Sequence, residues 1–430
     1  MKIIGLLSGT SVDGIDAALV DITGYGLETQ VRLLGFETYP FPEGVRERVL
    51  EVSSPETGTV DKICHLNFYL GELFAQAAVH LAKQGGYDLE EIDLIGTHGQ
   101  TIHHLPEPRY ERGLTPPSPL RPEEKSGFLA IRSTLQIGEP SIIAERTGCT
   151  VVADFRPRDI AAGGEGAPLA PYAHYLLFRS GENARAVHNI GGISNVTFIP
   201  ARAEPQQVIA FDTGPGNVII DGLTREITRG KLSFDLDGRM AAGGQVHPPL
   251  LNWLMEHPYL RKPPPKTTGR EEFGGEFIQK LFGKAVEQNL PSEDLLATAT
   301  AFTAESIADS YRRFLPLGIE AGTGPSDGLK PASVEVILCG GGARNKTLAA
   351  MLQKALSPIP VKSVEDYGYS GDALEALLFA LLARETVLGI PNNLPSATGA
   401  RYPVVLGKIL PGRNWRSLLS LSPPLEGSRR

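Results

Sequence analysis

The first two apolar runs of the chain are separated by a connection of only seven residues. Lys2–Leu7 and Ile15–Ile22 have the composition of buried strands, and Ser8–Gly14 between them is rich in glycine and hydroxyl groups. Parallel neighbouring strands need a crossover of about a dozen residues or more, usually a helix. The two runs are therefore predicted to form an antiparallel hairpin, and a mixed sheet fits the sequence better than a doubly wound Rossmann sheet.

Strands of the same kind recur along the chain, with helical patterns between them. Further predicted strands, rich in Val and Ile, are Ile92–Ile95, Val151–Asp154, Ala186–Ile190, Val208–Asp212 and Val334–Cys339. Apolar residues spaced three to four apart predict helices at Val60–Lys83, Asp294–Phe314 and Gly371–Leu388. Pro-rich polar stretches predict exposed loops, the first of them partly disordered, at Leu105–Lys125, Pro258–Lys266, Gly322–Lys330 and Ser422–Arg430. Strands that alternate with helices indicate an α/β protein.

Size, charge and cysteine usage narrow the class of protein. A chain of 430 residues can form two or three domains or two large lobes. Its formal net charge is −8 without a long basic run, so neither nucleic acid nor an anionic membrane is a predicted partner. Three distant cysteines without a C-x-x-C pair, and apolar segments too short for a signal peptide or membrane span, predict a soluble protein of the reducing cytoplasm.

Three glycine-rich turns follow predicted strands, at Ser8–Gly14, Asp212–Asn217 and Cys339–Asn345. Glycine lets backbone N–H groups approach a phosphate closely, and a following helix N-terminus adds partial positive charge. One such turn is often only a turn, but three with hydroxyls and carboxylates interspersed predict a nucleotide site. The chain contains no Walker P-loop, no G-x-G-x-x-G fingerprint, and no G-x-S-x-G or H-E-x-x-H motif, which argues against the commoner nucleotide folds, serine hydrolases and zinc proteases.

Asp212 is the most informative carboxylate, because it ends the apolar run Val208–Phe211 and precedes a Gly-Pro-Gly turn. A rigid carboxylate at a strand end suits a general base or a group that orients water near a phosphate. The alternative is an Asp that closes its own turn.

The first hairpin offers two further carboxylates, and a group of histidines follows later. Asp13 and Asp16 could position Mg²⁺ through water, although Asp residues that stabilise a turn look the same. His98, His103 and His104 have no Cys or Glu at metal-ligand spacing, so no direct protein–metal site is predicted.

Six segments occur in order between about residues 3 and 415: Gly9–Asp16, Gly96–Thr101, Asp154–Arg156 with Gly163–Leu169, Asn189–Asn195, Phe211–Asn217 and Cys339–Asn345. Together they resemble the anhydro-N-acetylmuramic acid kinase family. The resemblance implies an α/β, two-lobed fold of the sugar-kinase, Hsp70 and actin type, with ribonuclease-H-like mixed sheets and the active site in the interdomain cleft. It implies an N-terminal lobe of residues 1–155 plus 395–430 with the first phosphate hairpin, and a C-terminal lobe of residues 156–394 with the second phosphate and adenosine loops.

The resemblance also implies the reaction. ATP, water and 1,6-anhydro-N-acetylmuramic acid would give N-acetylmuramic acid 6-phosphate and ADP, with Mg²⁺ bound through ATP near Asp13. Such an enzyme would act in amino-sugar metabolism and cell-wall recycling as a cytoplasmic homodimer.

Each functional residue is carried over by its place in these segments. The implied catalytic residues are Asp212, as base for the attacking water, and Glu375, which holds that water. An alternative for Glu375 is a surface charge on an amphipathic helix. The implied nucleotide-binding residues are Gly9, Thr10, Ser11, Val12, Asp13, Gly14, Ile15, Asp16, Asn189, Gly191, Gly192, Gly214, Gly216, Asn217, Gly340, Gly341, Gly342 and Asn345. The implied substrate-binding residues are His98, Gln100, Arg156, Arg158 and Asp159.

Some features depart from the family and leave alternatives open. Glu165 stands where the family commonly has Gln, and Pro108–Arg132 resembles an insertion. Pro264–Glu271 and Leu406–Ser417 are similar to levoglucosan kinases, which act on 1,6-anhydroglucose and give glucose 6-phosphate. An ordinary hydroxyl-phosphorylating sugar kinase and a non-catalytic ATP-binding scaffold are the other hypotheses.

Overall fold

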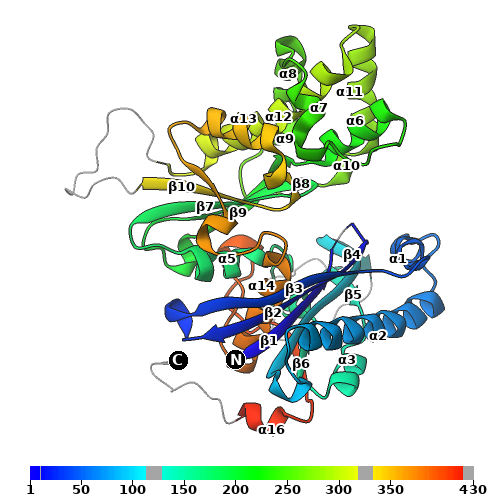
Figure 1. Ribbon diagram of the computed structural model, residues 1–430, viewed down its shortest axis with the longest axis vertical. Coiled ribbons are helices and arrows are strands. Elements are labelled where there is room, and N and C mark those ends of the chain that lie inside the picture. Colours follow the sequence, from blue (N-terminus) through cyan, green and yellow to red (C-terminus); the bar gives the residue numbers. More distant parts are fainter. Residues whose placement is uncertain (10, 113–127, 318–332, 420–430) are drawn as a thin grey trace. The chain divides into compact units, whose positions relative to one another are not determined.

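The chain folds into two compact units (Figure 1). The structure is a computed structural model that describes residues 1–9, 11–112, 128–317 and 333–419. Unit 1 comprises Met1–Leu177 and Ala373–Arg430, and unit 2 comprises Phe178–Asp372. Each unit contains its own mixed sheet covered by helices, so the predicted two-lobed α/β fold is confirmed.

Unit 1 is built on a seven-stranded sheet in the order β12-β6-β4-β1-β2-β3, with β5 paired to β4. The strands are β1 (Lys2–Ser8), β2 (Gly14–Thr23), β3 (Gln30–Pro40), β4 (Leu94–Arg112), β5 (Phe128–Ile137), β6 (Val151–Ala153) and β12 (Lys408–Leu410). β1 pairs antiparallel with β2, with Leu7 opposite Asp16, and parallel with β4. The predicted hairpin and the mixed sheet are thereby confirmed.

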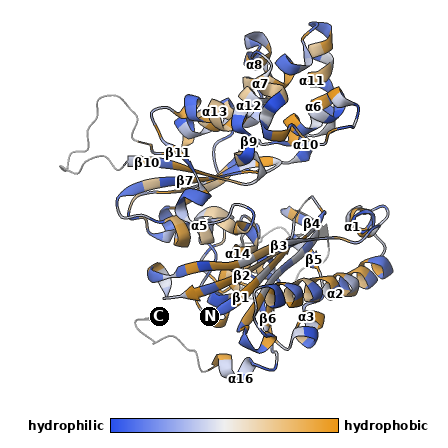
Figure 2. Cartoon of the chain, viewed as in Figure 1, coloured by the Kyte–Doolittle hydropathy of each residue, from blue (hydrophilic) through white to orange (hydrophobic). Residues whose placement is uncertain are grey.

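Two long helices cover opposite faces of this sheet. Ile4 and Leu6 of β1 pack in one core with Phe74 of α2, while Gly5, which points the other way, lies against α14. Figure 2 shows polar and apolar residues alternating around α2, as the spacing predicted. The helices of this part are α1 (Val45–Ser53), α2 (Val60–Gln84), α3 (Pro140–Thr147), α4 (Phe155–Ala161), α5 (Ala170–Phe178), α14 (Leu374–Val387), α15 (Pro395–Thr398) and α16 (Trp415–Leu418).

Glycine allows α14 to approach the sheet at backbone distance. A Cβ added at Gly5 would lie 1.9 Å from the carbonyl oxygen of Ala376, and one at Gly96 would lie 2.1 Å from that of Phe379. Any side chain at either position would push the helix away. The two glycines therefore set the height of α14 above β1 and β4.

Unit 2 is built on a five-stranded sheet in the order β11-β10-β7-β8-β9. Its strands are β7 (Asn183–Ile190), β8 (Ile193–Ile199), β9 (Ile209–Pro215), β10 (Ser333–Cys339) and β11 (Val361–Ser363). β7, β8 and β9 form an antiparallel meander, and β10 runs parallel to both β7 and β11. Its helices are α6 (Val218–Thr228), α7 (Arg239–Ala242), α8 (Pro248–Met255), α9 (Pro258–Arg261), α10 (Arg270–Phe273), α11 (Gly275–Glu287), α12 (Ser292–Phe314) and α13 (Lys346–Leu356).

The structure corrects two of the predicted loops. β4 continues through Arg112 and pairs with β5, so the first part of Leu105–Lys125 is strand, and a register shift between Leu105 and Arg109 accommodates its prolines. Pro258–Lys266 contains α9 and ends at a buried lysine. The predicted loops at Gly322–Lys330 and Ser422–Arg430 lie outside the described residues. The sequence patterns missed β3, β5 and β8, which contain polar residues at many positions.

The division into units differs from the predicted lobe boundaries. Residues 156–177 and 373–394, predicted for the C-terminal lobe, belong to unit 1. The reason at the second boundary is the packing of α14 on β1, β2 and β4, which joins it to the first sheet. Among the described helices, none is both long and apolar enough to cross a membrane.

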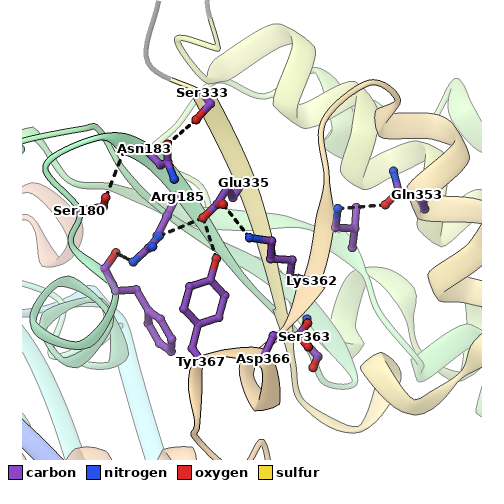
Figure 3. A network of polar contacts seen from close by, with 12 residues as sticks. Ser180, Asn183, Arg185, Ser333, Glu335, Gln353, Lys362, Ser363, Asp366 and Tyr367 are labelled. Carbon is purple, nitrogen blue, oxygen red and sulfur yellow. Dashed lines mark hydrogen bonds and ion pairs between the residues drawn. The ribbon is translucent and has the colours of Figure 1, made fainter.

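A network of ionic contacts joins three segments of unit 2 around Glu335 (Figure 3). Glu335 on β10 accepts hydrogen bonds from Arg185 on β7 (3.2 Å), Lys362 on β11 (2.7 Å) and the Tyr367 hydroxyl (2.6 Å). Burial alone would raise the pKa of this carboxyl, but the hydrogen bonds from Lys362, Tyr367 and Arg185 outweigh it and lower the pKa to about 2. The network therefore stabilises the β7–β10–β11 edge.

Replacing Glu335 with Gln should destabilise this edge by about 1–3 kcal/mol, because two cations lose their partner. The folded pKa lies below the ordinary value of 4.5, so the contribution is complete above pH 4.5 and is lost as the pH falls toward about 2. Amide hydrogen exchange of β10 measures the change. The exposed pair Glu305–Arg312 supplies the control, since Glu305→Gln should cost under about 0.5 kcal/mol. Equal effects of the two substitutions would contradict the prediction.

Candidate functional site

The sequence pattern predicted that Asp212 ends its strand, but β9 continues through Pro215. Asp212 is the middle residue of β9 and is held from three directions. Its backbone N–H donates to the Lys266 carbonyl (3.1 Å), and its own carbonyl accepts the Tyr259 hydroxyl (2.8 Å). The Thr268 N–H donates to Oδ2 of the carboxylate (3.0 Å). Backbone pairing thus fixes both the main chain and the side chain of Asp212.

The surroundings of Asp212 favour a carboxyl that titrates near neutrality. Burial, with a smaller contribution from the charge of Glu271, raises its pKa to about 6 against the opposing effects of the Thr268 N–H and the Lys266 charge. A general base works best when its pKa lies near the operating pH. Asp212 therefore has the position and the proton affinity of a general base.

A buried chain of hydrogen bonds supports the next residue of β9. The Thr213 hydroxyl bonds to that of Ser194 (2.8 Å), which bonds to Nε2 of His188 (2.6 Å), and Nδ1 of His188 bonds to the Tyr311 hydroxyl (2.8 Å). Burial lowers the pKa of His188 to about 3, so the ring is neutral. The chain links β7, β8, β9 and α12 directly beside Asp212.

The glycine segments predicted to bind nucleotide in unit 2 converge in the structure. A Cβ added at Gly340 would meet the Asn189 side chain at 2.2 Å, and one at Gly216 would meet the Gly191 carbonyl at 2.3 Å. Gly342 likewise lies against Ile190. The turns after β7, β9 and β10 therefore form one glycine-lined surface, as a nucleotide site would require.

The hydrogen bonds of this surface correct one expectation. The N–H groups of Gly216 and Asn217 donate to the carbonyls of Gly192 (2.9 Å) and Gly191 (2.8 Å), because the β7–β8 turn caps the start of α6. These two N–H groups are thus engaged within the protein rather than turned toward a phosphate. Asn345 similarly caps α13, accepting the Leu348 N–H at 3.0 Å. The nucleotide role of these residues stays a prediction, as do those of Gly214 and the exposed Gly341.

In unit 1, the β1–β2 turn presents exposed oxygen atoms. Ser11 donates to Asp13 (2.9 Å), and both side chains are exposed. Val12 adopts φ 54°, the left-handed region, and its N–H closes the turn on the Gly9 carbonyl (3.2 Å). Thr10 lies outside the described residues.

Several other residues of the hairpin lack a side chain that is free to reach a ligand. Val12 and Ile15 have buried side chains, and Gly14 has no room for one, because a Cβ there would lie 2.5 Å from the Tyr39 carbonyl oxygen. Asp16 accepts the Thr38 hydroxyl (2.6 Å). Only the backbone of Val12, Gly14 and Ile15 is thus available to a nucleotide, and their assignment stays a prediction.

Arg156 forms a hydrogen bond with His98, and its charge acts on Glu375 in the first turn of α14. Its Nε donates to Nε2 of His98 (3.0 Å), so Nδ1 carries the imidazole proton and donates to the Gly99 carbonyl (3.1 Å). Burial and the Arg156 charge lower the pKa of His98 well below its ordinary value, which keeps the ring neutral.

Glu375 retains contact with solvent, although the surrounding protein removes much of its hydration. This desolvation raises the pKa of its carboxyl, Asp16 raises it further, and Arg156 opposes both. Glu375 is exposed at the first turn of α14, the charges of Asp16 and Arg156 act on it, and its catalytic role stays a prediction.

A polar cavity of about 300 Å³ lies beside His98 in unit 1. It is lined by Asn67, Thr97, His98, Gly99, Thr134, Leu135, Gln136, Ile137, Gly138, Glu139, Pro140, Ala153, Asp154, Pro157 and Lys408. Lys408 pairs with Asp154 at 2.7 Å. Hydroxyl, amide and charged groups of this kind suit a small ligand rich in hydroxyls.

The other predicted substrate residues have different environments. Asp159 is fully buried and accepts from the Gly166 N–H, Asn393 and Thr398, so its carboxylate holds unit 1 together. Gln100 is buried against Ser8, and Arg158 is exposed. Their contact with substrate stays a prediction. Within the described chain, no three His, Cys, Asp or Glu side chains gather as a metal site would require.

Sequence reasoning missed the residues that surround Asp212. Tyr259 and Lys266 belong to the Pro-rich stretch Pro258–Lys266, predicted to be an exposed loop, and Thr268 follows it. The available signal was a lysine between three consecutive prolines and Thr-Thr-Gly, a pattern similar to that of levoglucosan kinases.

Comparison with known proteins identifies relatives across almost the whole chain. A sequence profile of the family described as anhydro-N-acetylmuramic acid kinase matches residues 1–115 and 125–412. The chain is similar to the anhydro-N-acetylmuramic acid kinase of Caldanaerobacter subterraneus subsp. tengcongensis, with 48% identity covering 95% of this chain and 96% of that protein. It is 44% identical to the corresponding kinase of Bacillus thuringiensis, covering 95% of this chain and 99% of that protein. A solved ROK family glucokinase from Streptomyces griseus, in complex with glucose and AMPPNP, aligns with 15% identity and a TM-score of 0.36, covering 90% of this chain and 100% of that one.

Ionisation of Asp212 should cost folding free energy, because its pKa is higher in the folded protein, about 6, than its ordinary value of 3.8. The wild type should therefore lose stability relative to Asp212→Asn as the pH rises from about 4 to 6, by on the order of 1–3 kcal/mol in total. Denaturation at a series of pH values measures this difference. Asp372→Asn, which alters an exposed carboxylate of the same unit, should show no such gain. A stability difference that is constant from pH 4 to 7 would refute the prediction.

Proposed function

Because the chain belongs to the anhydro-N-acetylmuramic acid kinase family, we propose that it uses ATP and water to convert 1,6-anhydro-N-acetylmuramic acid to N-acetylmuramic acid 6-phosphate and ADP. The observation that carries the proposal is Asp212, a carboxylate of β9 held by the Thr268 N–H four residues before Gly216, with a pKa raised to about 6. A non-catalytic scaffold would have no need to keep a desolvated carboxylate in this position.

The proposed reaction follows from the chemistry of the substrate. A 1,6-anhydro sugar has no free hydroxyl at O6, so O6 can accept phosphate only as the C1–O6 bond breaks. Water attacks C1 and gives its proton to Asp212, and the electron pair of the C1–O6 bond passes to O6. O6 then bonds to the γ-phosphorus of ATP while the bond to the β–γ bridging oxygen breaks and ADP leaves.

Unit 1 supplies the second proposed carboxylate and the proposed sugar contacts. Glu375 is assigned to orienting the water, and its charge is balanced by Arg156. Arg156 also fixes the neutral His98, one of the residues that line the polar cavity. A hydroxyl of the sugar can donate to or accept from the groups that line this cavity.

Nucleotide binding is assigned to the β1–β2 turn and to the glycine surface of unit 2. The exposed hydroxyl of Ser11 and carboxylate of Asp13 are oxygen groups that could position an ATP-bound Mg²⁺ through its waters. Mg²⁺ would neutralise charge on the ATP phosphates. Levoglucosan is the second candidate substrate, and the curated relatives at 44–48% identity favour the muramic acid derivative. Cytoplasmic location, a homodimer and a role in cell-wall recycling belong to the same proposal.

Supplying ATP with each anhydro sugar separately tests the substrate. We expect the 6-phosphate of N-acetylmuramic acid by mass spectrometry, with at least a tenfold lower kcat/KM for levoglucosan. In ¹⁸O-labelled water the heavy oxygen should appear at C1, because water opens the ring. Unlabelled N-acetylmuramic acid 6-phosphate, kept in labelled water for the same time, controls for exchange at C1. If neither anhydro sugar supports the release of ADP, the proposed function is wrong.

Asp212→Asn should fold and bind ATP but lose about 10²–10⁴-fold in kcat, since the amide cannot accept the proton of water. In the wild type, kcat should fall below pH about 6, where Asp212 becomes protonated. Steady-state kinetics across pH 5–8 measure both effects, with Asp372→Asn as the control. Unchanged turnover in Asp212→Asn would exclude the mechanism.

A further inference from the structure

Lys266 is a buried lysine that the proposed reaction does not use. Only 6% of the residue is exposed, and within the described chain its Nζ has no hydrogen-bond partner. The ammonium instead lies over three aromatic rings, 4.8 Å from the centroids of Tyr259 and Phe314 and 5.7 Å from that of Phe211. Cation–π attraction replaces part of the lost hydration. Because burying a charge costs free energy, a buried lysine of this kind indicates a functional role.

The backbone around Lys266 is attached to Asp212. The Lys266 carbonyl accepts the Asp212 N–H (3.1 Å), and two residues later the Thr268 N–H donates to the Asp212 carboxylate (3.0 Å). We call residues 266–268 the strap. Tyr259, one wall of the aromatic cage, also donates to the Asp212 carbonyl (2.8 Å). Anchoring of the Lys266 side chain therefore also anchors the groups that orient Asp212.

The charges around Lys266 determine its protonation. Burial lowers the pKa of the amine to about 8, and the negative charges of Asp309 and Asp212 resist that fall. The positive charges of Arg313 and Lys262 disfavour the protonated amine and so also lower its pKa. The balance leaves the amine mostly protonated at neutral pH, where it acts on the carboxyl of Asp212.

Opposing effects also set the pKa of the Asp212 carboxyl. Burial and Glu271 raise the pKa of its carboxyl, whereas the Thr268 N–H and the Lys266 charge lower it. Without the strap, both opposing contributions would be lost. Lys266 and Asp212 therefore stabilise one another's charged forms.

We propose that Lys266 is a positioning residue for Asp212: its caged ammonium anchors the strap against the carboxylate and supplies the positive charge that keeps this carboxylate ready to accept a proton. The kinetic consequence rests on the proposed function, but the interaction itself does not. A lysine kept only for packing would be replaceable by an apolar chain of the same length without any change in the titration of Asp212.

The experiment compares Lys266→Met with Lys262→Met. Met fills a similar volume without charge, and Lys262 is an exposed lysine over the same Tyr259 ring (5.5 Å). Carboxyl ¹³C NMR of the whole protein, with the Asp212 resonance assigned from Asp212→Asn, follows the titration directly. We expect the pKa of Asp212 to rise by on the order of one unit in Lys266→Met and to stay unchanged in Lys262→Met.

Kinetics provide a second readout. The acidic limb of kcat in Lys266→Met should move to higher pH by the same amount as the carboxyl titration, and turnover should recover as the pH is raised. An unmoved Asp212 titration, or a loss of kcat that is equal at every pH, would overturn the proposal. If the wild type converts neither anhydro sugar, the proposed function fails while the NMR titration still decides the Lys266–Asp212 interaction.

A reciprocal measurement covers the case in which Lys266→Met does not fold. Because the two charges stabilise one another, Asp212→Asn should lower the pKa of Lys266, observed through the ¹³Cε resonance of that lysine. The ammonium keeps the support of Asp309, so the fall should be partial. An unchanged Lys266 titration in Asp212→Asn would overturn the proposal equally.

Discussion

Close approach between backbones, where glycine leaves no Cβ in the way, determines where the functional groups of each unit lie. In unit 1, Gly5 and Gly96 bring α14 onto β1 and β4. β4 carries His98 and the first turn of α14 carries Glu375, so the same contact fixes both. In unit 2, Gly216 and Gly340 bring the turns after β9 and β10 onto the β7–β8 turn. A single methyl group at any of these positions would separate segments that are far apart in sequence.

The second constraint is the energetic cost of a buried carboxylate. Burial within β9 removes hydration from Asp212, and the strap offsets part of that cost through the Thr268 N–H and the positive charge of Lys266. The result is a carboxyl that is ionised at neutral pH yet still a useful proton acceptor. Asp159 shows the contrasting solution, in which three donors satisfy the carboxylate and leave it a structural role.

Much of the fold could be predicted from local sequence. The seven-residue connection required an antiparallel hairpin, and the spacing in Val60–Lys83 matched α2 nearly end to end. β3 and β5 could not be predicted, because strands that are partly exposed lack a continuous apolar run. β8 is mostly buried, but Ser194, Asn195 and Thr197 interrupt its apolar run. The extension of β4 was likewise missed, since pairing with β5 rather than apolar composition stabilises it.

For the site, the sequence by itself determined which chemical groups are present: a carboxylate after an apolar run, three glycine turns and the order of segments that identifies the family. Only the tertiary structure decided what each group can do. In the folded protein the N–H groups of Gly216 and Asn217 are hydrogen-bonded to the β7–β8 turn, and Asp159 is buried in the core. Lys266 lies in an aromatic cage next to the backbone that holds Asp212. The physical reason is that hydrogen-bond satisfaction and proton affinity depend on neighbours brought together by folding, which residue type and spacing along the chain do not specify.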